Sequence, residues 1–252
     1  MRILLSNDDS LSSPFLSATA KALSKIGEVL IVVPQSEQSW IGRAYSRHKK
    51  LTLKRVDFLD FDCHTIDGTP ADCVNIALNH IYKDSQPDIV VSGMNIGHNT
   101  GFPLLLSSGT FAAAVEGASQ NILSFALSKH LDNKHYESCR LRHENIPTEL
   151  EVTLKNACNH ATSFIKKIAE ENSTKSNCIY NLNYPSEFDL SNEFKLCKTA
   201  NVETPSFYKQ NPDGTFEFQY AIGKVLDKEL TDLYCMQNNI ACYSKINLYD
   251  LL

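Results

Sequence analysis

Short apolar runs alternate with helix-like segments through the first half of the chain, and this alternation limits the fold more than any other feature. The run from Arg2 to Ser6 is typical of a strand buried on both faces. Ser13-Pro14 predicts a helix start, because serine caps helices and proline is tolerated at the first helical position. A second buried strand follows over Val29 to Val33. Strand, helix and strand of these lengths predict a parallel crossover unit.

The same pattern continues to about residue 185. We predict a helix capped at Thr69 and a helix of small residues from Phe111. We predict strands at Leu51 to Val56, Cys63 to Ile66, Asp88 to Ser92 and Ile122 to Ser128. A long amphipathic helix then runs from Leu150 to Ile168, and a strand covers Ile179 to Asn183. We therefore predict an α/β protein with an open, Rossmann-like, mostly parallel sheet and helices on both faces.

The last part of the chain has weaker periodicity. Asp213-Gly214 lies between two aromatic runs and predicts a hairpin turn. We divide the chain into an α/β core at 1–185 and a C-terminal hairpin and helix extension at 186–252. A short segment buries little apolar surface of its own, so we expect the extension to take part in oligomerisation.

Composition excludes several functional classes. The 252 residues include 42% hydrophobic residues, enough for a sizeable core, and carry a net charge of -5. This mild acidity argues against a nucleic-acid partner, and no apolar run approaches the ~20 residues of a membrane span. The N-terminal run turns polar at Ser6, too early for a signal peptide. We expect a cytoplasmic protein without a membrane partner.

The eight cysteines form no CxxC pair. In a cytoplasmic chain we expect them to be reduced and mostly buried. Their spacing argues against a zinc site.

Three loops at the predicted carboxyl ends of strands carry unusual polar residues. The first holds Asp8 and Asp9, the second Ser39, and the third runs from Ser92 to Ser108 with Asn95 and Asn99. Ligands bind beyond the carboxyl ends of strands in open parallel sheets. Paired carboxylates favour a divalent cation, although one aspartate capping a turn would explain the first loop equally well by itself.

The third loop ends at Ser108-Gly109-Thr110, where a helix is predicted to begin. Free N–H groups and the helix dipole make such a start a site for anions, whereas ordinary capping would explain only one hydroxyl residue. Oxygen ligands beside a phosphate site favour Mg or Mn and suggest phosphoryl chemistry.

Several stretches together resemble the survival protein SurE family of metal-dependent nucleotidases. They are Arg2-Ile3-Leu4-Leu5-Ser6-Asn7-Asp8-Asp9, Asp67-Gly68-Thr69-Pro70-Ala71-Asp72, Pro87-Asp88-Ile89-Val90-Val91-Ser92-Gly93-Met94-Asn95 and Ser108-Gly109-Thr110. The resemblance implies one divalent metal ion per subunit, bound by Asp8, Asp9, Ser39 and Asn95. It implies that Asn99, Ser108, Gly109 and Thr110 bind phosphate. It also implies a homodimer or homotetramer.

The function implied is hydrolysis of nucleoside 5′- and 3′-monophosphates, and some members of the family also trim short polyphosphate. Asp8 and Asp9 are the expected catalytic residues, which orient or deprotonate water or act as a direct nucleophile. The alternative is a nucleotide-binding protein of the same fold with weak or lost catalysis. One departure is Ser10, where the family has glycine. A nucleotide-sugar transferase is more remote, since no second α/β unit is evident.

Overall fold

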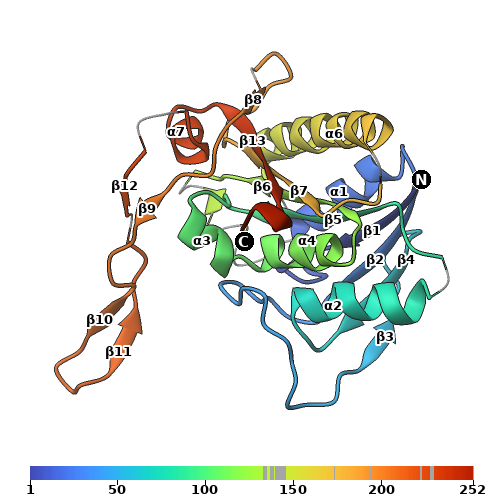
Figure 1. The fold of residues 1–252 in the computed structure, drawn as a ribbon, viewed down its shortest axis with the longest axis horizontal. Helices are drawn as coiled ribbons and strands as arrows, with labels where there is room; N and C mark the ends of the chain where they lie inside the picture. Colours follow the sequence, from blue (N-terminus) through green and yellow to red (C-terminus); the bar gives the residue numbers. More distant parts are fainter. Residues whose placement is uncertain are drawn as a thin grey trace.

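The fold is built on a nine-stranded sheet with strand order β3-β4-β2-β1-β5-β6-β7-β13-β8 (Figure 1). This computed structural model describes the whole chain except residues 84, 133–134, 137–138, 140–145, 173, 193, 222, 228–229 and 252. From β4 to β7 every neighbouring pair is parallel. The open, mostly parallel sheet predicted from the sequence is confirmed.

The sheet and its extensions consist of β1 (Arg2–Ser6), β2 (Glu28–Pro34), β3 (Leu53–Arg55), β4 (Asp62–Ile66), β5 (Ile89–Ile96), β6 (Leu123–Lys129), β7 (Cys178–Tyr184), β8 (Phe194–Leu196), β9 (Val202–Glu203), β10 (Tyr208–Gln210), β11 (Phe216–Phe218), β12 (Lys224–Val225) and β13 (Ala241–Asn247). The helices are α1 (Pro14–Leu23), α2 (Pro70–Ile76), α3 (Phe102–Ser107), α4 (Gly109–Ser119), α6 (Thr148–Glu171) and α7 (Asp232–Gln237), with a π-helical turn η1 (Ala77–Ile81) and a 3-10 turn η2 (Leu248–Leu251).

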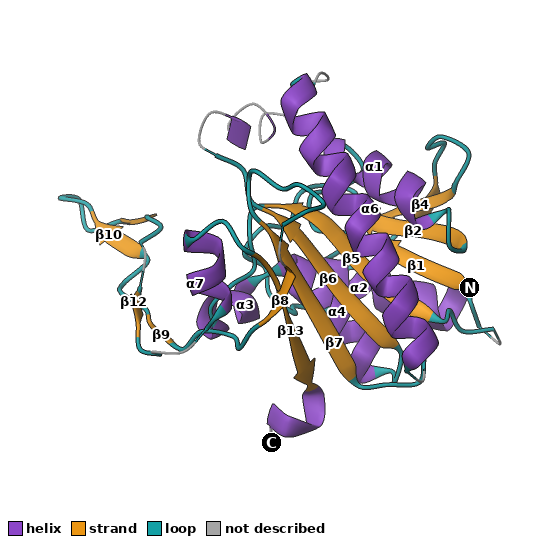
Figure 2. Ribbon diagram, turned by 90° about the horizontal axis from the view of Figure 1, so that it is seen from above, coloured by secondary structure: helices purple, strands orange, loops and turns teal. Residues whose placement is uncertain are grey.

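Helices cover both faces of the sheet (Figure 2). On one face, α1 and α6 pack on each other and on a large apolar cluster that includes Phe15, Leu154 and Phe125. On the other face, α2 packs against α4 over a second cluster that includes Val74 and Ala113. The predicted caps are present, since the side chains of Ser13 and Thr69 accept hydrogen bonds at the starts of α1 and α2.

Helix α4 lies unusually close to the sheet because its inward face is made of alanine and glycine. A Cβ added at Gly117 would lie 2.6 Å from Ser124 Oγ and 2.7 Å from Val90 Cγ2. No larger residue fits there without moving the helix. The small residues thus permit this close packing, and α4 has almost no freedom to move toward the sheet.

The C-terminal part divides into two structural pieces. Strand β13 pairs antiparallel with β7 and parallel with β8, so these strands complete the large sheet. The β10–β11 hairpin projects away from it (Figures 1 and 2), and its strands flank the predicted turn at Asp213-Gly214. None of the helices in the described part of the chain is long and apolar enough to cross a membrane.

The segment from Ser92 to Ser108 is more regular than the loop predicted for it. Strand β5 continues to Ile96, and helix α3 occupies much of the remainder. After a shift in register, Asn95 and Ile96 pair with Ser128 and Lys129 of β6. This irregular pairing breaks the simple buried-strand pattern at Ser92, which is why the sequence prediction ended the strand too early.

Candidate functional site

The predicted metal ligands lie at the carboxyl ends of three neighbouring strands. Asp8 and Asp9 follow β1, Ser39 belongs to the loop after β2, and Asn95 lies near the end of β5. The strand order β2-β1-β5 places the three strand ends side by side. Two loops are also tied together directly, because the Gln38 backbone N–H donates to the Asp8 carbonyl oxygen at 2.8 Å.

Asp8 is buried against the N-terminus of α4. The Thr110 hydroxyl donates to Asp8 Oδ1 at 2.6 Å. A Cβ added at Gly109 would lie 2.7 Å from Asp8 Cβ and 2.9 Å from Asp8 Oδ2, so the close approach requires glycine. Burial raises the pKa of Asp8 to about 6, partly opposed by the Thr110 hydrogen bond. The carboxylate charge therefore carries a desolvation cost that a nearby cation would offset.

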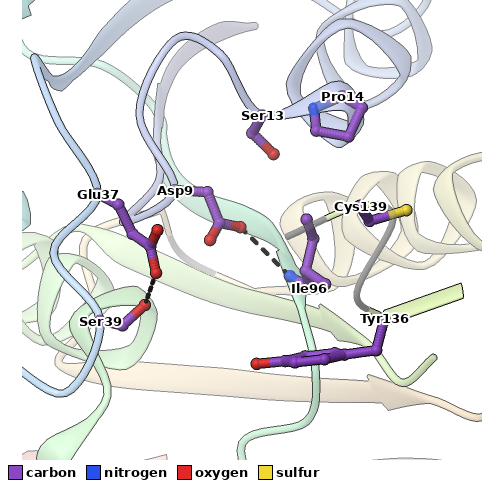
Figure 3. Close-up of a pocket in the computed structure, with 8 residues that line it drawn as sticks. All are labelled: Asp9, Ser13, Pro14, Glu37, Ser39, Ile96, Tyr136 and Cys139. Atoms are coloured by element: carbon purple, nitrogen blue, oxygen red, sulfur yellow. Dashed lines mark hydrogen bonds between the residues drawn. The ribbon is translucent and has the colours of Figure 1, made fainter. Parts of the chain in front are cut away.

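Asp9 faces a small pocket shared with the loop after β2 (Figure 3). Its carboxylate accepts a hydrogen bond from the Ile96 backbone N–H at 3.3 Å. Ser39 lines the same pocket, and its hydroxyl donates to Glu37 Oε1 at 2.6 Å. Glu37 is thus a further carboxylate at this site, which the sequence analysis did not single out because it resembles any exposed loop glutamate.

The side chains on and after these strand ends include the carboxylates of Asp8, Asp9 and Glu37, the Ser39 hydroxyl and the Asn95 amide. Such ligands fit a hard divalent cation and fit a soft metal poorly. Beside them, the buried Asn7 Oδ1 accepts no hydrogen bond from any described residue. A buried acceptor of this kind needs a bound species or water to satisfy it. The side-chain chemistry here therefore fits a hard divalent cation.

The predicted phosphate ligands divide into two groups. Ser108 caps α4 by accepting a hydrogen bond from the Phe111 N–H at 3.0 Å, while Gly109 and Thr110 contact Asp8. The start of α4 and Asp8 are thus in direct contact. Thr110 is fully buried, so its hydroxyl holds Asp8 in place.

Asn99 is held separately by side chains of β6 and β7. Its amide donates to Ser128 Oγ at 2.9 Å, and its backbone N–H donates to Asn183 Oδ1 at 2.8 Å. Its carbonyl oxygen accepts from the amides of Asn181 and Asn183 at 2.8 and 3.1 Å. These two asparagines have a positioning role that strand periodicity alone could not reveal.

Asp232 connects the same loop to the C-terminal part of the chain. Its Oδ2 accepts from the Gly101 N–H at 3.1 Å, and its Oδ1 accepts from the Ala200 N–H at 2.9 Å. Gly101 has φ of 77°, a left-handed conformation that favours glycine. Burial raises the pKa of Asp232 to about 6, in opposition to these hydrogen bonds. The anchor lies far from the loop in sequence, so only the fold shows it.

Comparison with known proteins agrees with this architecture. A family model described as survival protein SurE matches residues 3–206. The chain belongs to the SurE family. A protein named 5′-nucleotidase SurE from Alkaliphilus metalliredigens (strain QYMF) is 35% identical over 207 residues, which are 80% of this chain and 72% of that protein.

Two further SurE proteins are similar in different ways. The 5′-nucleotidase SurE of Myxococcus xanthus (strain DK1622) is 45% identical over 127 residues, 50% of this chain and 47% of that protein, so the alignment spans about half its length. The crystal structure of the SurE protein from Aquifex aeolicus has a TM-score of 0.78 at 25% identity and covers 100% of this chain and 97% of that chain. The SurE fold therefore extends through the C-terminal part.

The residue after the paired aspartates has an unusual backbone conformation. Ser10 has φ of 67°, in the left-handed region where a side chain is strained. Its Oγ lies 3.0 Å from Ser12 Oγ, and its carbonyl oxygen accepts from the Asn7 amide at 2.9 Å. The chain thus keeps the backbone turn that glycine would adopt freely, immediately after Asp8 and Asp9.

Ser10→Gly is expected to raise the free energy of unfolding by about 0.5 kcal/mol, because relief of ~1–2 kcal/mol of strain exceeds the ~0.4–1 kcal/mol gained by the unfolded chain. Ser12→Gly is the matched control, since it removes the same hydroxyl contact at a residue without positive φ. Denaturant unfolding measures both variants. An equal or larger gain in Ser12→Gly would show that strain at Ser10 is not the cause.

Proposed function

We propose that this SurE protein is a metal-dependent phosphomonoesterase that hydrolyses nucleoside 5′- and 3′-monophosphates to nucleoside and phosphate. The observation that carries the proposal is the seating of the buried Asp8 carboxylate against the first turn of α4, where Thr110 donates to it at 2.6 Å. The names of the relatives from Alkaliphilus and Myxococcus support it. Short polyphosphate is a second substrate class in the proposal.

The metal ligands in this proposal are Asp8, Asp9, Ser39 and Asn95, which lie on adjacent strand ends. When bound, a single Mg or Mn ion supplies positive charge that stabilises the phosphate oxygens during transfer. Glu37 shares the pocket of Asp9 and Ser39 and holds the Ser39 hydroxyl through a 2.6 Å hydrogen bond. We assign it a positioning role for Ser39.

The phosphate is bound in this proposal by Asn99 and by Ser108, Gly109 and Thr110 at the start of α4. A helix N-terminus attracts phosphate through its unpaired N–H groups and its dipole. In this proposal the Asp8 and Asp9 carboxylates orient or deprotonate the attacking water, and Asp8 contacts the start of α4. Because Thr110 donates its hydroxyl to Asp8, it also fixes the direction of that carboxylate.

The test is phosphate release from a panel of nucleoside 5′- and 3′-monophosphates and from short polyphosphate. With Mn or Mg we expect catalytic turnover, and with excess chelator we expect release to fall to background until metal is restored. Full activity in chelator would refute the metal dependence. Tight nucleotide binding without turnover under any metal would instead favour the alternative of a nucleotide-binding protein.

Oligomerisation through the C-terminal extension at 186–252 is also part of the proposal, as a homodimer or homotetramer. The extension includes β13 of the large sheet, and its hairpin projects away from that sheet, where Phe218 also contacts Trp40. This hairpin exposes Tyr208, Phe216 and Phe218. Contiguous exposed aromatic surface is typical of an interaction site. We place the protein in the cytoplasm, supported by all eight cysteines being free thiols.

Replacing residues 206–221 by a Gly-Ser pair is expected to convert the oligomer to a monomer. The pairing of Glu203 with Lys224 keeps the two ends of the deletion close, so the core sheet should persist. Light scattering gives the mass, and circular dichroism reports the fold. Phe216→Ser, a single change on the exposed hairpin, should weaken assembly in the same direction. A monomeric intact chain at micromolar concentration would refute the proposal.

A further inference from the structure

Three cysteines meet in the C-terminal part, away from the paired aspartates. Cys197 follows β8, Cys235 lies in α7 and Cys242 in β13. All three are buried, and their sulfur atoms lie within 4.8 Å of one another. Among the residues that the structure describes, this is the one group of three His, Cys, Asp or Glu side chains close enough to share a metal ion.

The spacing of the sulfur atoms is close to that of a metal site. Thiolates bound to zinc at ~2.3 Å in tetrahedral geometry lie roughly 3.8 Å apart, so the cluster needs to contract by about an ångström at most. A disulfide requires about 2.05 Å and would join only two of the three sulfurs. An arrangement of three mutually close thiols therefore fits one shared metal ion better than a covalent pair.

The three cysteines are held by regular backbone hydrogen bonds. The Cys197 N–H donates to the Tyr243 carbonyl oxygen at 2.9 Å, and the Ile240 N–H donates to the Cys235 carbonyl oxygen at 2.8 Å. Cys242 lies in the β13 strand between β7 and β8. Ligands on preformed elements lose little conformational entropy when they bind a metal.

The thiols of the cluster share hydrogen bonds with one another. A hydrogen bond with Cys242 lowers the pKa of Cys235, and burial opposes this shift. The pKa of Cys242 is raised because it takes part in hydrogen bonds with Cys197 and Cys235. A bound cation would replace the thiol protons of these hydrogen bonds.

We propose that Cys197, Cys235 and Cys242 bind one zinc ion as thiolates. Binding releases the three thiol protons to solvent and forms three zinc–sulfur bonds without any change in oxidation state. A pocket of about 570 Å³ lies beside Cys197 and is also lined by Lys198, Thr199 and Ser244.

The zinc ion would have a structural role, because it cross-links three elements of the C-terminal part. It joins the three-residue edge strand β8 and helix α7 to β13 of the large sheet. Asp232 is in the first turn of α7 and accepts hydrogen bonds from Gly101 and Ala200. A metal at the cluster therefore stiffens the element that anchors the Gly101 loop, without contributing to the oxygen site at Asp8.

Cobalt(II) titration of the reduced, metal-free full-length protein tests the proposal. Cobalt bound to thiolates gives a near-ultraviolet charge-transfer band that oxygen ligands do not give. We expect the band to saturate at one ion per chain and to disappear when zinc is added. It should persist in Asp8→Asn, which alters only the oxygen site.

Cys197→Ser should weaken cobalt binding at least tenfold and remove most of the band. Serine can keep the hydrogen bond that Cys197 Sγ donates to the Tyr243 carbonyl oxygen, so the variant is expected to fold. Cys178→Ser, a cysteine at the start of β7 outside the cluster, is the matched control and should keep the band.

Thermal unfolding supplies a second measurement. Zinc should raise the melting temperature of the wild type and of Cys178→Ser more than that of Cys197→Ser, because only the cluster couples metal to the stability of β8 and α7. A folded wild type without the band, a band unchanged by Cys197→Ser, or a native disulfide among the three cysteines under reducing conditions would overturn the proposal.

Discussion

Asp8→Asn is expected to lower kcat/KM for nucleotide hydrolysis on the order of 10³-fold, the scale seen when one preorganised electrostatic contact is removed from a transition state. Asparagine keeps the size of the side chain and retains an oxygen that can accept the 2.6 Å hydrogen bond from Thr110. It lacks the negative charge required to bind a divalent cation. The loss should therefore lie in metal binding and in the chemical step rather than in folding.

The thermal stability of Asp8→Asn distinguishes a loss of metal binding and chemistry from a loss of folding. Burial raises the pKa of Asp8 to about 6, so the protein without metal stabilises the charged form less than solvent does. The neutral asparagine removes this penalty, and the metal-free variant should unfold at a temperature equal to or above that of the wild type. Such a gain in stability with a loss of activity is typical of a charged active-site residue.

Asp62→Asn is the matched control for the same chemical change. Asp62 is at the start of β4, where its half-exposed carboxylate forms an ion pair with Arg55 at 3.2 Å. Exposed pairs of this type contribute little, so activity and stability should stay near the wild-type values. If Asp8→Asn retained activity within a few-fold of the wild type, Asp8 would not bind the metal.

Local sequence patterns were sufficient to predict the parallel core. The apolar runs of β1 and β2 are buried on both faces, and proline and serine mark the start of α1 as expected. These signals depend on residues close together in the chain. The continuation of β5 to Ile96 was missed because it depends on pairing with β6, and that pairing includes a register shift that sequence does not reveal.

The candidate site likewise contains residues that local sequence could predict and residues that only the fold brings together. Paired aspartates after a buried strand could be selected from sequence because the strand end determines where they lie. Asp232 could not, since its partners Gly101 and Ala200 belong to remote segments. The three-cysteine cluster was also missed: spacing rules for zinc sites describe short loops, whereas Cys197, Cys235 and Cys242 meet only after β8, α7 and β13 assemble.

Gly109→Ala is expected to lower kcat/KM by at least about 10²-fold, because displacing a catalytic group by even an ångström has effects of this size. The added methyl carbon would lie 2.7 Å from Asp8 Cβ and 3.1 Å from the Gln38 carbonyl oxygen. Optimal contacts between carbon atoms are ~3.5–4.0 Å, so one of the neighbouring groups must move. Alanine has the higher helix propensity, which excludes loss of the helix as the cause.

The packing of α4 determines which group moves. The helix cannot approach the sheet, since Gly117 already lies against Ser124 and Val90. A shift away from the sheet would open a gap beneath the buried alanines, at a cost that rises with the volume of the gap. The loop that carries Asp8 is therefore expected to yield, and the carboxylate loses its alignment with Thr110 and with Asp9.

Gly214→Ala is the matched control, because the added carbon meets nothing within 4 Å in the exposed turn between β10 and β11. Its φ of 86° still imposes backbone strain, so the control also measures how much a strained alanine far from the site affects activity. Steady-state kinetics over a range of Mn concentrations separates weaker metal binding from a slower chemical step. Near-normal activity in Gly109→Ala at every Mn concentration would mean that the approach of α4 to Asp8 has no part in catalysis.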